Sequence, residues 1–374
     1  MIVMFFASLV FVVYTYAGYP LLLWFFAYLI GEKPRRKWQR GLPKVAVVIP
    51  AYNEQSVIAD KLRIVLDSHY PAHLLRVLVV SDGSSDDTLV NAQSVVDPRL
   101  LVIGKQTRSG KMATVNYAMS LVDEPIIIMT DVGEMFDEDT IGRLVDRFAD
   151  PEIGAVSGEL GLVSLKTGFS RTLGAYWRYE KAIRSWEAIV GSVVGVTGPV
   201  YAIRRELFQA LPVDTILDDL AIPLEVIKQG YRVAYERRAF AFERATQIGA
   251  HEFIRKRRTL AGNYQVIGRY GRLLLPGSPI AWQFWSHKVF RLLVPYALVG
   301  MLIGGMALSG WVGIVATAGQ VAFYGLAASA TLARRSKRPW LNIPYTFCVL
   351  NWAAVAGFYF YLTGRLTVQW EKVK

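Results

Sequence analysis

Hydrophobic residues form long unbroken runs at the two ends of the chain and short runs in its middle. Residues 2–30 contain no charged side chain, and at about 1.5 Å per helical residue they can cross about 30 Å of hydrocarbon. A secretory signal peptide would have a shorter apolar core preceded by Lys or Arg. We therefore expect an uncleaved transmembrane anchor over residues 1–31.

The C-terminal part has three further apolar runs. Residues 289–308 and 311–332 are long enough to form a helical hairpin through a membrane. Residues 343–362 either make a third span or lie in the interface. We expect a C-terminal transmembrane region of two or three spans over residues 287–364.

The middle of the chain alternates short apolar runs with segments of helical periodicity. The runs at 45–49, 76–81, 100–103 and 126–130 are typical of buried strands, and helices are expected at 56–68, 86–95 and 111–121. Uninterrupted apolar strands that alternate with helices indicate a mostly parallel sheet covered on both faces. The fold class is therefore α/β, with one Rossmann-like domain over residues 42–250.

Three more helices are expected towards the C-terminal side of this region. Residues 167–190 form a long helical pattern, and residues 218–230 begin with two acidic side chains, which suits the helix dipole. Residues 253–267 are amphipathic, with a basic face from Arg255 to Arg258. Since this segment precedes the hairpin, we expect an amphipathic interface helix over residues 251–276.

The net charge of +12 is concentrated in part beside the apolar runs. Lys33 to Lys37 follow the anchor, and Arg334 to Arg338 follow the hairpin, so the positive-inside rule puts both clusters and the domain in the cytoplasm. Such clusters can also bind nucleic acid. Beside a spanning helix, membrane lipids are the simpler partner, so we expect no nucleic acid partner.

The cysteine and histidine residues give no indication of a disulfide or a metal site. The single Cys348 excludes an internal disulfide and a cysteine-based metal cluster. His69 and His73 are four residues apart, but Pro71 lies between them and no acidic partner is expected nearby. A histidine metal site is therefore not expected.

Carboxylates supply the candidate chemistry. Asp131 ends the strand at 126–130, Asp82 ends the strand at 76–81, and Asp218 and Asp219 open a helix. Acids at the carboxyl ends of strands in an open α/β sheet lie in the ligand crevice. On a basic chain this pattern indicates a site for a nucleotide-sugar and a metal, although each Asp could also only cap a turn or a helix.

A P-loop is excluded at Gly104 to Lys111. Five residues separate its glycines where a P-loop has four, and Met112 replaces the required Ser or Thr.

The ordered set of motifs resembles family 2 glycosyltransferases. It comprises Pro50-Ala51-Tyr52-Asn53-Glu54, Ser81-Asp82-Gly83-Ser84-Ser85-Asp86, Gly110-Lys111, Thr130-Asp131 and Leu217-Asp218-Asp219. With its membrane segments the chain is similar to the membrane-bound branch, which includes cellulose, hyaluronan and poly-N-acetylglucosamine synthases. The resemblance implies a GT-A fold, a nucleotide-sugar donor that is usually UDP-linked, a divalent metal and an inverting hexosyltransferase reaction.

The resemblance also implies roles for individual residues. Tyr52, Glu54 and Asp82 would border the nucleoside, Lys111 would lie near the donor, and Asp131 would lie near its ribose, diphosphate and metal. Asp219 would be the catalytic base and Asp218 a supporting acid. Mg²⁺ or Mn²⁺ fits a site built from carboxylates.

Two motifs depart from the family. The metal motif Asp-x-Asp is here Asp131-Val132-Gly133, and Gly133 cannot bind a metal, while Glu134 could replace it only in a shifted turn. In processive synthases the motif Gln-x-x-Arg-Trp binds the growing chain. Here Arg258 matches its Arg and remains a candidate for donor contact, but Thr259 replaces Trp.

These features predict a polysaccharide or oligosaccharide acceptor at the cytoplasmic face of a bacterial inner membrane. Two alternatives remain open. The acceptor could be a lipid phosphate, or the chain could be a non-catalytic subunit of a polysaccharide assembly complex. A partner subunit or a homo-oligomer is expected if a long product is exported.

Overall fold

The computed structural model describes residues 1–39, 41–162, 168–243, 250–332 and 339–364. The chain divides into two compact units, which we describe separately. The sheet unit takes its described residues from 32–162 and 191–243, and the helical unit takes them from 1–31, 168–190 and 250–364.

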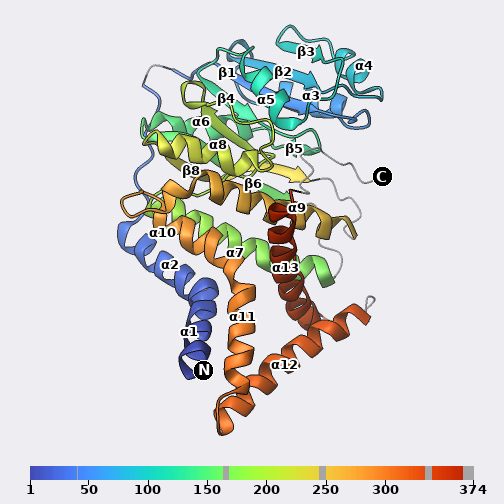
Figure 1. Ribbon diagram of the computed structural model, residues 1–374. Helices are drawn as coiled ribbons and strands as arrows, with labels where there is room; N and C mark the ends of the chain where they lie inside the picture. The colour runs from blue at the N-terminus through green and yellow to red at the C-terminus, as the bar shows by residue number, and fades with distance from the viewer. Residues whose placement is uncertain (40, 163–167, 244–249, 333–338, 365–374) are drawn as a thin grey trace. The chain divides into compact units, whose positions relative to one another are not determined.

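Within its described residues the sheet unit is built on one mixed, mostly parallel sheet of eight strands, whose arrangement Figure 1 shows. The strands are β1 (Val45–Ala51), β2 (Leu75–Ser81), β3 (Leu100–Gly104), β4 (Ile126–Met129), β5 (Glu134–Phe136), β6 (Ile153–Leu162), β7 (Tyr201–Arg204) and β8 (Arg232–Glu243). Their order is β3-β2-β1-β4-β7-β6-β8-β5. β1, β2, β3 and β4 are mutually parallel and β6 is parallel to β8, whereas β7 runs antiparallel to β4 and β6.

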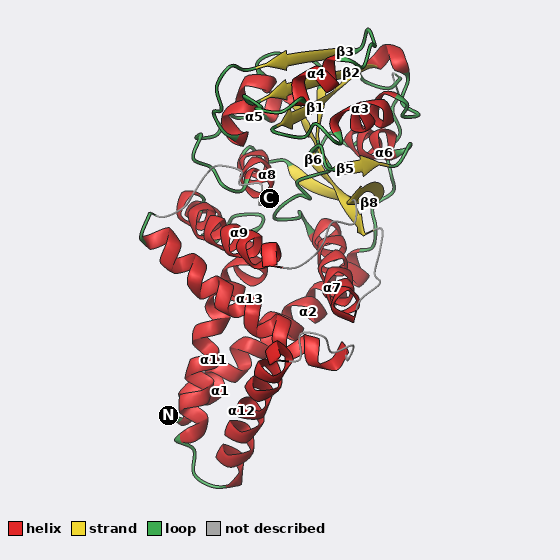
Figure 2. Cartoon of the chain, turned by 90° about the vertical axis from the view of Figure 1, so that its right-hand side faces the viewer, coloured by secondary structure: helices red, strands yellow, loops and turns green. Residues whose placement is uncertain are grey.

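Helices accompany this sheet as the alternating pattern predicts (Figure 2). The sheet unit contains α3 (Ile58–Leu66), α4 (Thr88–Gln93), α5 (Lys111–Met119), α6 (Thr140–Asp146), α8 (Asp218–Lys228) and the 3₁₀ turns Ala72–Leu74, Arg147–Ala149 and Arg205–Leu207. All seven residues of β1 are buried, and Ile58, Leu62 and Val65 of α3 lie in the same hydrophobic core. Burial on this scale makes β1 a central strand rather than an edge strand.

The strand register brings four chain segments to one edge of the sheet. Ala51 pairs with Ser81 at the carboxyl ends of β1 and β2, and Val48 pairs with Met129, the last residue of β4. Because β7 is antiparallel to β4, its first residue, Tyr201, also pairs with Met129. The segments that follow β1, β2 and β4 and the segment that precedes β7 therefore meet at this edge.

The helical unit contains the apolar runs. Its elements are α1 (Ile2–Val13), a π-helical turn at Tyr14–Gly18, α2 (Tyr19–Ile30), α7 (Gly168–Val190), α9 (Ala250–Arg269), a 3₁₀ turn at Gly271–Leu274, α10 (Ala281–Gln283), a second π-helical turn at Phe284–Val289, α11 (Phe290–Met306), α12 (Trp311–Leu332) and α13 (Pro339–Leu362). Among the described residues four helical segments are long and apolar enough to cross a membrane: Ile2–Ile30, Ala281–Met306, Trp311–Ala330 and Ile343–Leu362. For the third C-terminal apolar run, the sequence allowed either a transmembrane span or an interface helix. By length and composition this run is one of the four candidate spans.

Small residues allow close helix packing within this unit. A β-carbon at Gly304 of α11 would lie 2.9 Å from the backbone of Phe5 in α1, and one at Gly357 of α13 would lie 2.9 Å from the backbone of Ala261 in α9. Glycine at helix contacts is typical of membrane proteins, because it lets the backbones approach. α1 and α11, and likewise α9 and α13, therefore pack directly on one another (Figure 1).

A buried polar network also joins the helices of this unit. Glu187 of α7 accepts hydrogen bonds from the Tyr19 hydroxyl and pairs with His287 Nδ1, each at 2.7 Å. His287 Nε2 lies 3.0 Å from Glu180 of α7, and Glu180 binds Arg291 of α11 at 2.5 Å. Ionisable groups inside apolar helices are costly unless they are paired, and here each carboxylate has a cationic or hydroxyl partner.

The basic cluster after the anchor has protein partners. Arg35 lies 2.8 Å from the buried carboxylate of Glu236, Lys33 lies 3.5 Å from Glu152, and Arg36 lies 3.9 Å from Asp150. These ion pairs hold the cluster within the sheet unit, to which it belongs, and its expected contact with lipid remains a prediction. Arg334 to Arg338 and the tail from Arg365 to Lys374 lie outside the described residues.

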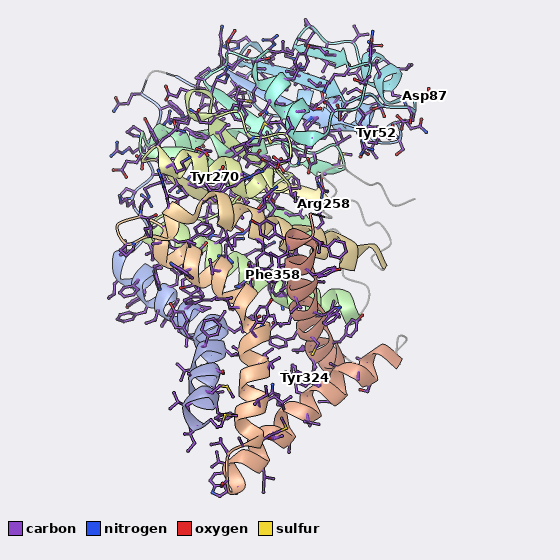
Figure 3. The ribbon with its side chains drawn as sticks, viewed as in Figure 1. Tyr52, Asp87, Arg258, Tyr270, Tyr324 and Phe358 are labelled. Atoms are coloured by element: carbon purple, nitrogen blue, oxygen red, sulfur yellow. The ribbon has the colours of Figure 1, made fainter. Side chains whose placement is uncertain are left out.

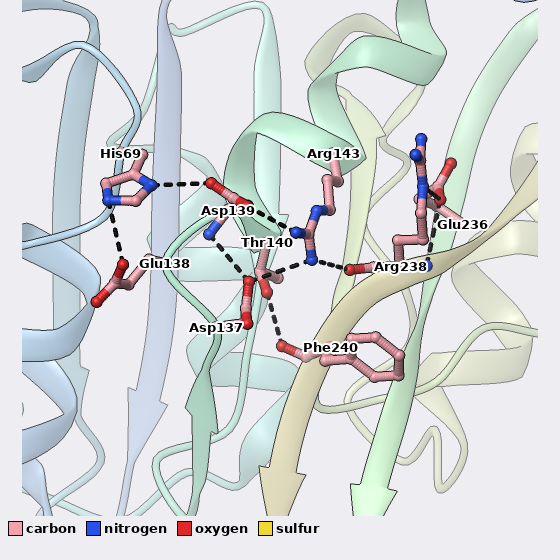
Figure 4. A network of polar contacts seen from close by, with 9 residues as sticks. All are labelled: His69, Asp137, Glu138, Asp139, Thr140, Arg143, Glu236, Arg238 and Phe240. Carbon is pink, nitrogen blue, oxygen red and sulfur yellow. Dashed lines mark hydrogen bonds and ion pairs between the residues drawn. The ribbon is translucent and has the colours of Figure 1, made fainter.

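The expectation that His69 has no acidic partner was wrong. Its ring nitrogens lie 2.8 Å from Asp139 and 3.1 Å from Glu138, and Asp139 also binds Arg143 at 2.6 Å (Figure 4). Both acids are distant in sequence, so spacing could not reveal them. The cluster is an exposed network of ion pairs that joins His69, Glu138, Asp139 and Arg143.

Candidate active site

Asp82, which follows β2, organises the loop before α5. Its Oδ1 accepts hydrogen bonds from the backbone N–H and hydroxyl of Ser109, both at 2.9 Å, and its Oδ2 accepts one from Gly110 N–H at 2.7 Å. Lys105 Nζ lies 3.0 Å from Oδ1. Burial alone would raise the pKa of Asp82, but these hydrogen bonds to Ser109, Lys105 and Gly110 hold it below its ordinary value. The carboxylate is therefore kept ionised, and it fixes the loop that leads to Lys111.

Gly83 is required where this loop crosses the end of β2. Its φ is +64°, and a β-carbon there would lie 2.6 Å from Arg108 N and 2.7 Å from the carbonyl carbon of Thr107. No side chain fits at such distances, and the positive φ also favours glycine. In this pair, Asp82 holds the loop through its charged carboxylate, and Gly83 lets the backbone of Thr107 and Arg108 approach closely.

The segment after β1 is held against the segment after β2. Asn53 adopts a positive φ of 54° and its side-chain oxygen accepts a hydrogen bond from Ser85 N–H at 2.9 Å. The Glu54 N–H donates to Thr88 Oγ1 at 2.6 Å, and the Arg108 guanidinium lies 3.9 Å from the Tyr52 ring centroid. Tyr52, which Figure 3 labels, and Glu54 are both partly exposed at this edge of the sheet.

Lys111 joins two carboxylates from distant parts of the chain. Its Nζ lies 3.0 Å from Asp131 Oδ1 and 3.0 Å from Asp218 Oδ2. Lys111 is the first residue of α5, Asp131 follows β4, and Asp218 is the first residue of α8. Burial alone would lower the pKa of Lys111, but the two carboxylates raise it above its ordinary value, so the ammonium stays charged.

Asp219 lies beside this cluster with part of its surface exposed. The Val196 N–H donates to its backbone carbonyl at 2.9 Å, and a β-carbon at Gly198 would lie 3.5 Å from its Oδ2. Thr197 anchors the intervening turn, since its hydroxyl donates to the Gly158 carbonyl at 2.8 Å. Asp219 is therefore the more accessible acid of the pair, and Asp218 is the buried one.

Lys61 is a site residue that the sequence analysis missed. It is fully buried on α3, and its Nζ donates to Thr130 Oγ1 at 2.8 Å and to the Glu134 carbonyl, so it spans the chain on both sides of Asp131. Burial lowers its pKa to about 7, against the opposing effect of the Glu134 and Asp131 carboxylates. The sequence could have revealed it, because Lys61 lies on the same helix face as the apolar residues Ile58, Leu62 and Val65.

Tyr201 is the second residue that was missed. It is 1% exposed, and its hydroxyl has no hydrogen-bond partner among the described residues. Burial, and then the carboxylates of Asp218, Asp219 and Asp131, raise the pKa of Tyr201 well above its ordinary value. The phenol therefore stays neutral beside the acids, and it was hidden from sequence analysis inside an ordinary apolar strand.

The structure thus brings together most of the residues that the motifs singled out. Lys111 contacts both Asp131 and Asp218. Tyr52, Glu54 and Asp82 lie in segments at the same edge of the sheet, and Asp219 lies beside Gly198, which belongs to the segment before β7. Arg258 belongs to α9 of the helical unit (Figure 3), so its expected donor contact remains a prediction.

The carboxylate pair suits a hard divalent cation. Two oxygens, from Asp131 and Asp218, converge on one cationic atom at 3.0 Å each, and Mg²⁺ and Mn²⁺ prefer oxygen ligands. Glu134 begins β5, and its backbone carbonyl accepts a hydrogen bond from Lys61, so its role as a substitute for the absent second Asp remains a prediction. Asp218 is a second carboxylate close to Asp131, since both lie 3.0 Å from Lys111 Nζ.

Comparisons with known proteins show what the domain that carries these residues is similar to. Residues 46–211 match the profile of glycosyl transferase family 2. A probable glycosyltransferase, YdaM, of Bacillus subtilis is 26% identical over 281 residues, which cover 70% of this chain and 66% of the relative. An N-acetylglucosaminyltransferase of Rhizobium meliloti is 28% identical over 214 residues, which cover 52% of this chain and 50% of the relative. The chain therefore spans between half and two thirds of the length of these curated relatives.

Among solved structures, a mannosyltransferase of Pyrobaculum calidifontis in complex with GDP-Man and Mn²⁺ has the same fold. It superposes with a TM-score of 0.73 at 21% identity, and the alignment covers 97% of this chain and 99% of that one. The expected GT-A fold is thereby confirmed, and four candidate membrane helices flank the domain along the chain. The chain therefore contains a domain, at residues 46–211, that matches the model of glycosyl transferase family 2.

Proposed function

We propose that this enzyme transfers a sugar from a nucleotide-sugar, UDP-linked by resemblance, to a glycan acceptor with inversion at the anomeric carbon. The observation that carries the proposal is the meeting of Lys111 with Asp131 and Asp218, next to the accessible Asp219. A fixed cation and several acids in one place match the needs of a reaction with an anionic leaving group and a hydroxyl nucleophile.

Asp219 is the proposed catalytic base. Transfer to a sugar hydroxyl requires a group that accepts the acceptor proton within hydrogen-bond reach. Asp219 is partly exposed, whereas Asp218 is 8% exposed and bound to Lys111. Asp218 is therefore assigned a supporting role, and the glycine at position 198 leaves room beside the Asp219 carboxylate.

The donor diphosphate is proposed to bind near Lys111 and Asp131. Lys111 keeps its charge and can stabilise the departing diphosphate. Asp131 would hold Mg²⁺ or Mn²⁺, which supplies Lewis-acid stabilisation of that leaving group when bound. Asp82 keeps the loop before Lys111 in place, and Tyr52 and Glu54 are proposed to border the nucleoside at the neighbouring strand end.

The decisive experiment compares donor binding with transfer in Asp219→Asn. We expect transfer to fall by about 10²–10⁴-fold, as is typical when a general base is lost, while UDP affinity stays within about twofold of wild type. Glu225→Gln is the matched control, because Glu225 lies on the same helix and pairs with Lys228 at 2.8 Å away from the cluster. Transfer at the wild-type rate by Asp219→Asn would remove this residue from the base role.

A lipid-linked acceptor is the second candidate, and Thr259 favours it. A processive polymer synthase needs a ring on which the growing glycan stacks, and Thr259 offers none at the matching position. A non-catalytic subunit is the third candidate. Mass spectrometry of products formed from a panel of UDP-sugars, with glycan or lipid-phosphate acceptors, separates the three, because a non-catalytic subunit gives no product with either acceptor.

The proposed location is the cytoplasmic face of a bacterial inner membrane. The support is the four apolar helices and the basic residues that follow the first of them, which the positive-inside rule assigns to the cytoplasm. Nucleotide-sugars are intracellular metabolites, so this side also gives the domain access to its donor.

A further inference from the structure

We propose that Lys111 is a tethered cation that occupies the Asp131–Asp218 pair when no donor is bound, so that a divalent ion must displace it to bind both carboxylates. The inference deepens the proposed function and rests on it for the identity of the donor. It assigns Asp218 as a metal ligand in addition to Asp131, and it makes Lys111 the residue that sets metal affinity.

The geometry carries the first step. Lys111 Nζ is 3.0 Å from one oxygen of each carboxylate, so a single positive atom bridges two acids that belong to different elements. The side chains of Lys111 and Asp218 are 16% and 11% exposed. Two carboxylates in such a setting repel one another unless a cation lies between them, and in this arrangement the cation is part of the chain.

The sequence departure explains why a second carboxylate is needed there. The metal motif has Gly133 in place of its second acid, and a β-carbon at Gly133 would have no heavy atom within 4 Å. The neighbouring acid, Glu134, binds Lys61 through its backbone carbonyl. Asp218 is the carboxylate that shares the Lys111 ammonium with Asp131, at 3.0 Å from each.

Charge balance gives the order of events. The pair carries two negative charges and Lys111 neutralises one, so a divalent ion that enters while Lys111 remains would meet an adjacent positive charge. A donor diphosphate is an alternative partner for the ammonium. When the diphosphate draws Lys111 away, both carboxylates become available, and metal and nucleotide are expected to bind cooperatively.

The test measures Mn²⁺ binding to the purified full-length protein without any nucleotide, by the loss of the free-Mn²⁺ electron paramagnetic resonance signal. We expect weak binding to wild type and at least about tenfold tighter binding to Lys111→Met, since a like charge about 3–4 Å from the ion is removed. Lys111→Arg keeps the charge and should resemble wild type. The double variant Lys111→Met with Asp218→Asn should lose the gain.

Lys228→Met is the control for removal of a positive charge. Lys228 lies on the same helix as Asp218 and pairs with Glu225 at 2.8 Å, so Mn²⁺ affinity should not change. Circular dichroism and a thermal melt establish that each variant is folded, and Lys111→Gln replaces Lys111→Met if the latter is not. A folded Lys111→Met or Lys111→Gln protein that binds Mn²⁺ no more tightly than wild type overturns the proposal.

Addition of UDP gives a second measurement. In wild type, UDP should raise Mn²⁺ affinity by a larger factor than it does in Lys111→Met, because only wild type has an ammonium to release. Equal factors in the two proteins would contradict the exchange. Neither measurement depends on sugar transfer, so a failure of the proposed reaction and a failure of the exchange are distinguishable.

Discussion

Gly198 faces Asp219 so closely that a β-carbon on the glycine would lie 3.5 Å from both Cβ and Oδ2 of the acid. This distance is ordinary van der Waals contact, so one methyl group fits, but a branched side chain would occupy the space beside the carboxylate. We predict that Gly198→Ala folds and keeps measurable transfer, whereas Gly198→Val lowers transfer by about tenfold or more, because small displacements of a catalytic group are costly.

The measurement is the initial rate of sugar transfer together with UDP affinity in the same preparations. UDP affinity should be unchanged in Gly198→Val, since the substitution contacts the proposed base and not the proposed diphosphate site. If Gly198→Val transferred sugar as fast as wild type, the space beside Asp219 would not be the place of the acceptor hydroxyl.

The lowered pKa of Lys61 predicts that the stability of the folded protein depends on pH. Burial lowers the pKa of Lys61 to about 7 in the folded protein, whereas the unfolded chain has a lysine pKa of about 10.4. Between these values the unfolded state binds more protons, so the stability contributed by this residue rises with pH, by up to about 1.4 kcal/mol per pH unit. Below pH 7 both states are protonated and the slope disappears.

The check is the melting temperature of wild type minus that of Lys61→Met, measured from pH 6 to pH 10 in one detergent. This difference should increase from about pH 7 upward, because only wild type has the titrating group. A difference that stays constant over the whole range would show that Lys61 has an ordinary pKa.

The buried network of the helical unit predicts a large stability effect. His287 lies between the carboxylates of Glu187 and Glu180, at 2.7 and 3.0 Å. Burial alone would raise the pKa of Glu180, but Arg291 and His287 hold it well below its ordinary value, so its charge needs these partners. Removal of one member of a buried pair costs about 3–5 kcal/mol.

We therefore expect Arg291→Met to lower the melting temperature of the detergent-solubilised protein by several degrees. Val299→Ala is the control, because Val299 is an exposed residue of the same helix α11. Equal melting temperatures for Arg291→Met and Val299→Ala would mean that the network contributes nothing to stability.

The single cysteine makes membrane topology testable. In a Cys348→Ser background, Asp87→Cys introduces a thiol on the exposed surface of the sheet unit, at a residue that Figure 3 labels. Ser309→Cys introduces one in the exposed loop between α11 and α12. An impermeant maleimide should label Ser309→Cys in intact cells and Asp87→Cys only after lysis, and the reverse pattern would contradict a cytoplasmic domain.

The sequence predicted the part of the fold that rests on local signals. Continuous apolar runs identified β1 to β4, and the unbroken apolar segments identified the candidate spans. The three-residue β5 escaped because it is too short to show a pattern, and β6 and β8 escaped because their glycines, charges and register shifts interrupt the alternation. These strands are defined by pairing between distant segments and not by their own residues.

The candidate site shows the same limit. The order of motifs singled out Asp131, Lys111 and Asp218, but only the folded chain reveals that one ammonium contacts both carboxylates. Lys61 could have been found as a charged residue on the buried face of α3. Tyr201 could not, because its strand reads as ordinary core and its importance comes from the acids around its hydroxyl.

The final prediction concerns product length. Tyr264, on the same helix as Thr259, is an aromatic residue that could replace the ring that Thr259 lacks. In the helical unit Tyr264 packs against α13, where its ring centroid lies 5.1 Å from that of Phe358 and 6.2 Å from that of Tyr361, and its hydroxyl donates to the Ala354 carbonyl at 3.3 Å. The Tyr264 ring therefore packs between helices, and we do not expect it to stack on a glycan in place of the missing tryptophan.

We therefore predict that the isolated chain makes short products, and that export of a long polymer needs a second subunit or an oligomer. A polar glycan that crosses the bilayer must be shielded from lipid, and the described helices offer four candidate spans for this purpose. The test reconstitutes the purified chain in liposomes with one UDP-sugar and sizes the product by mass spectrometry. Thr259→Trp should lengthen the product, Thr259→Val is its matched control, and long polymer inside vesicles that contain only the wild-type chain would refute the prediction.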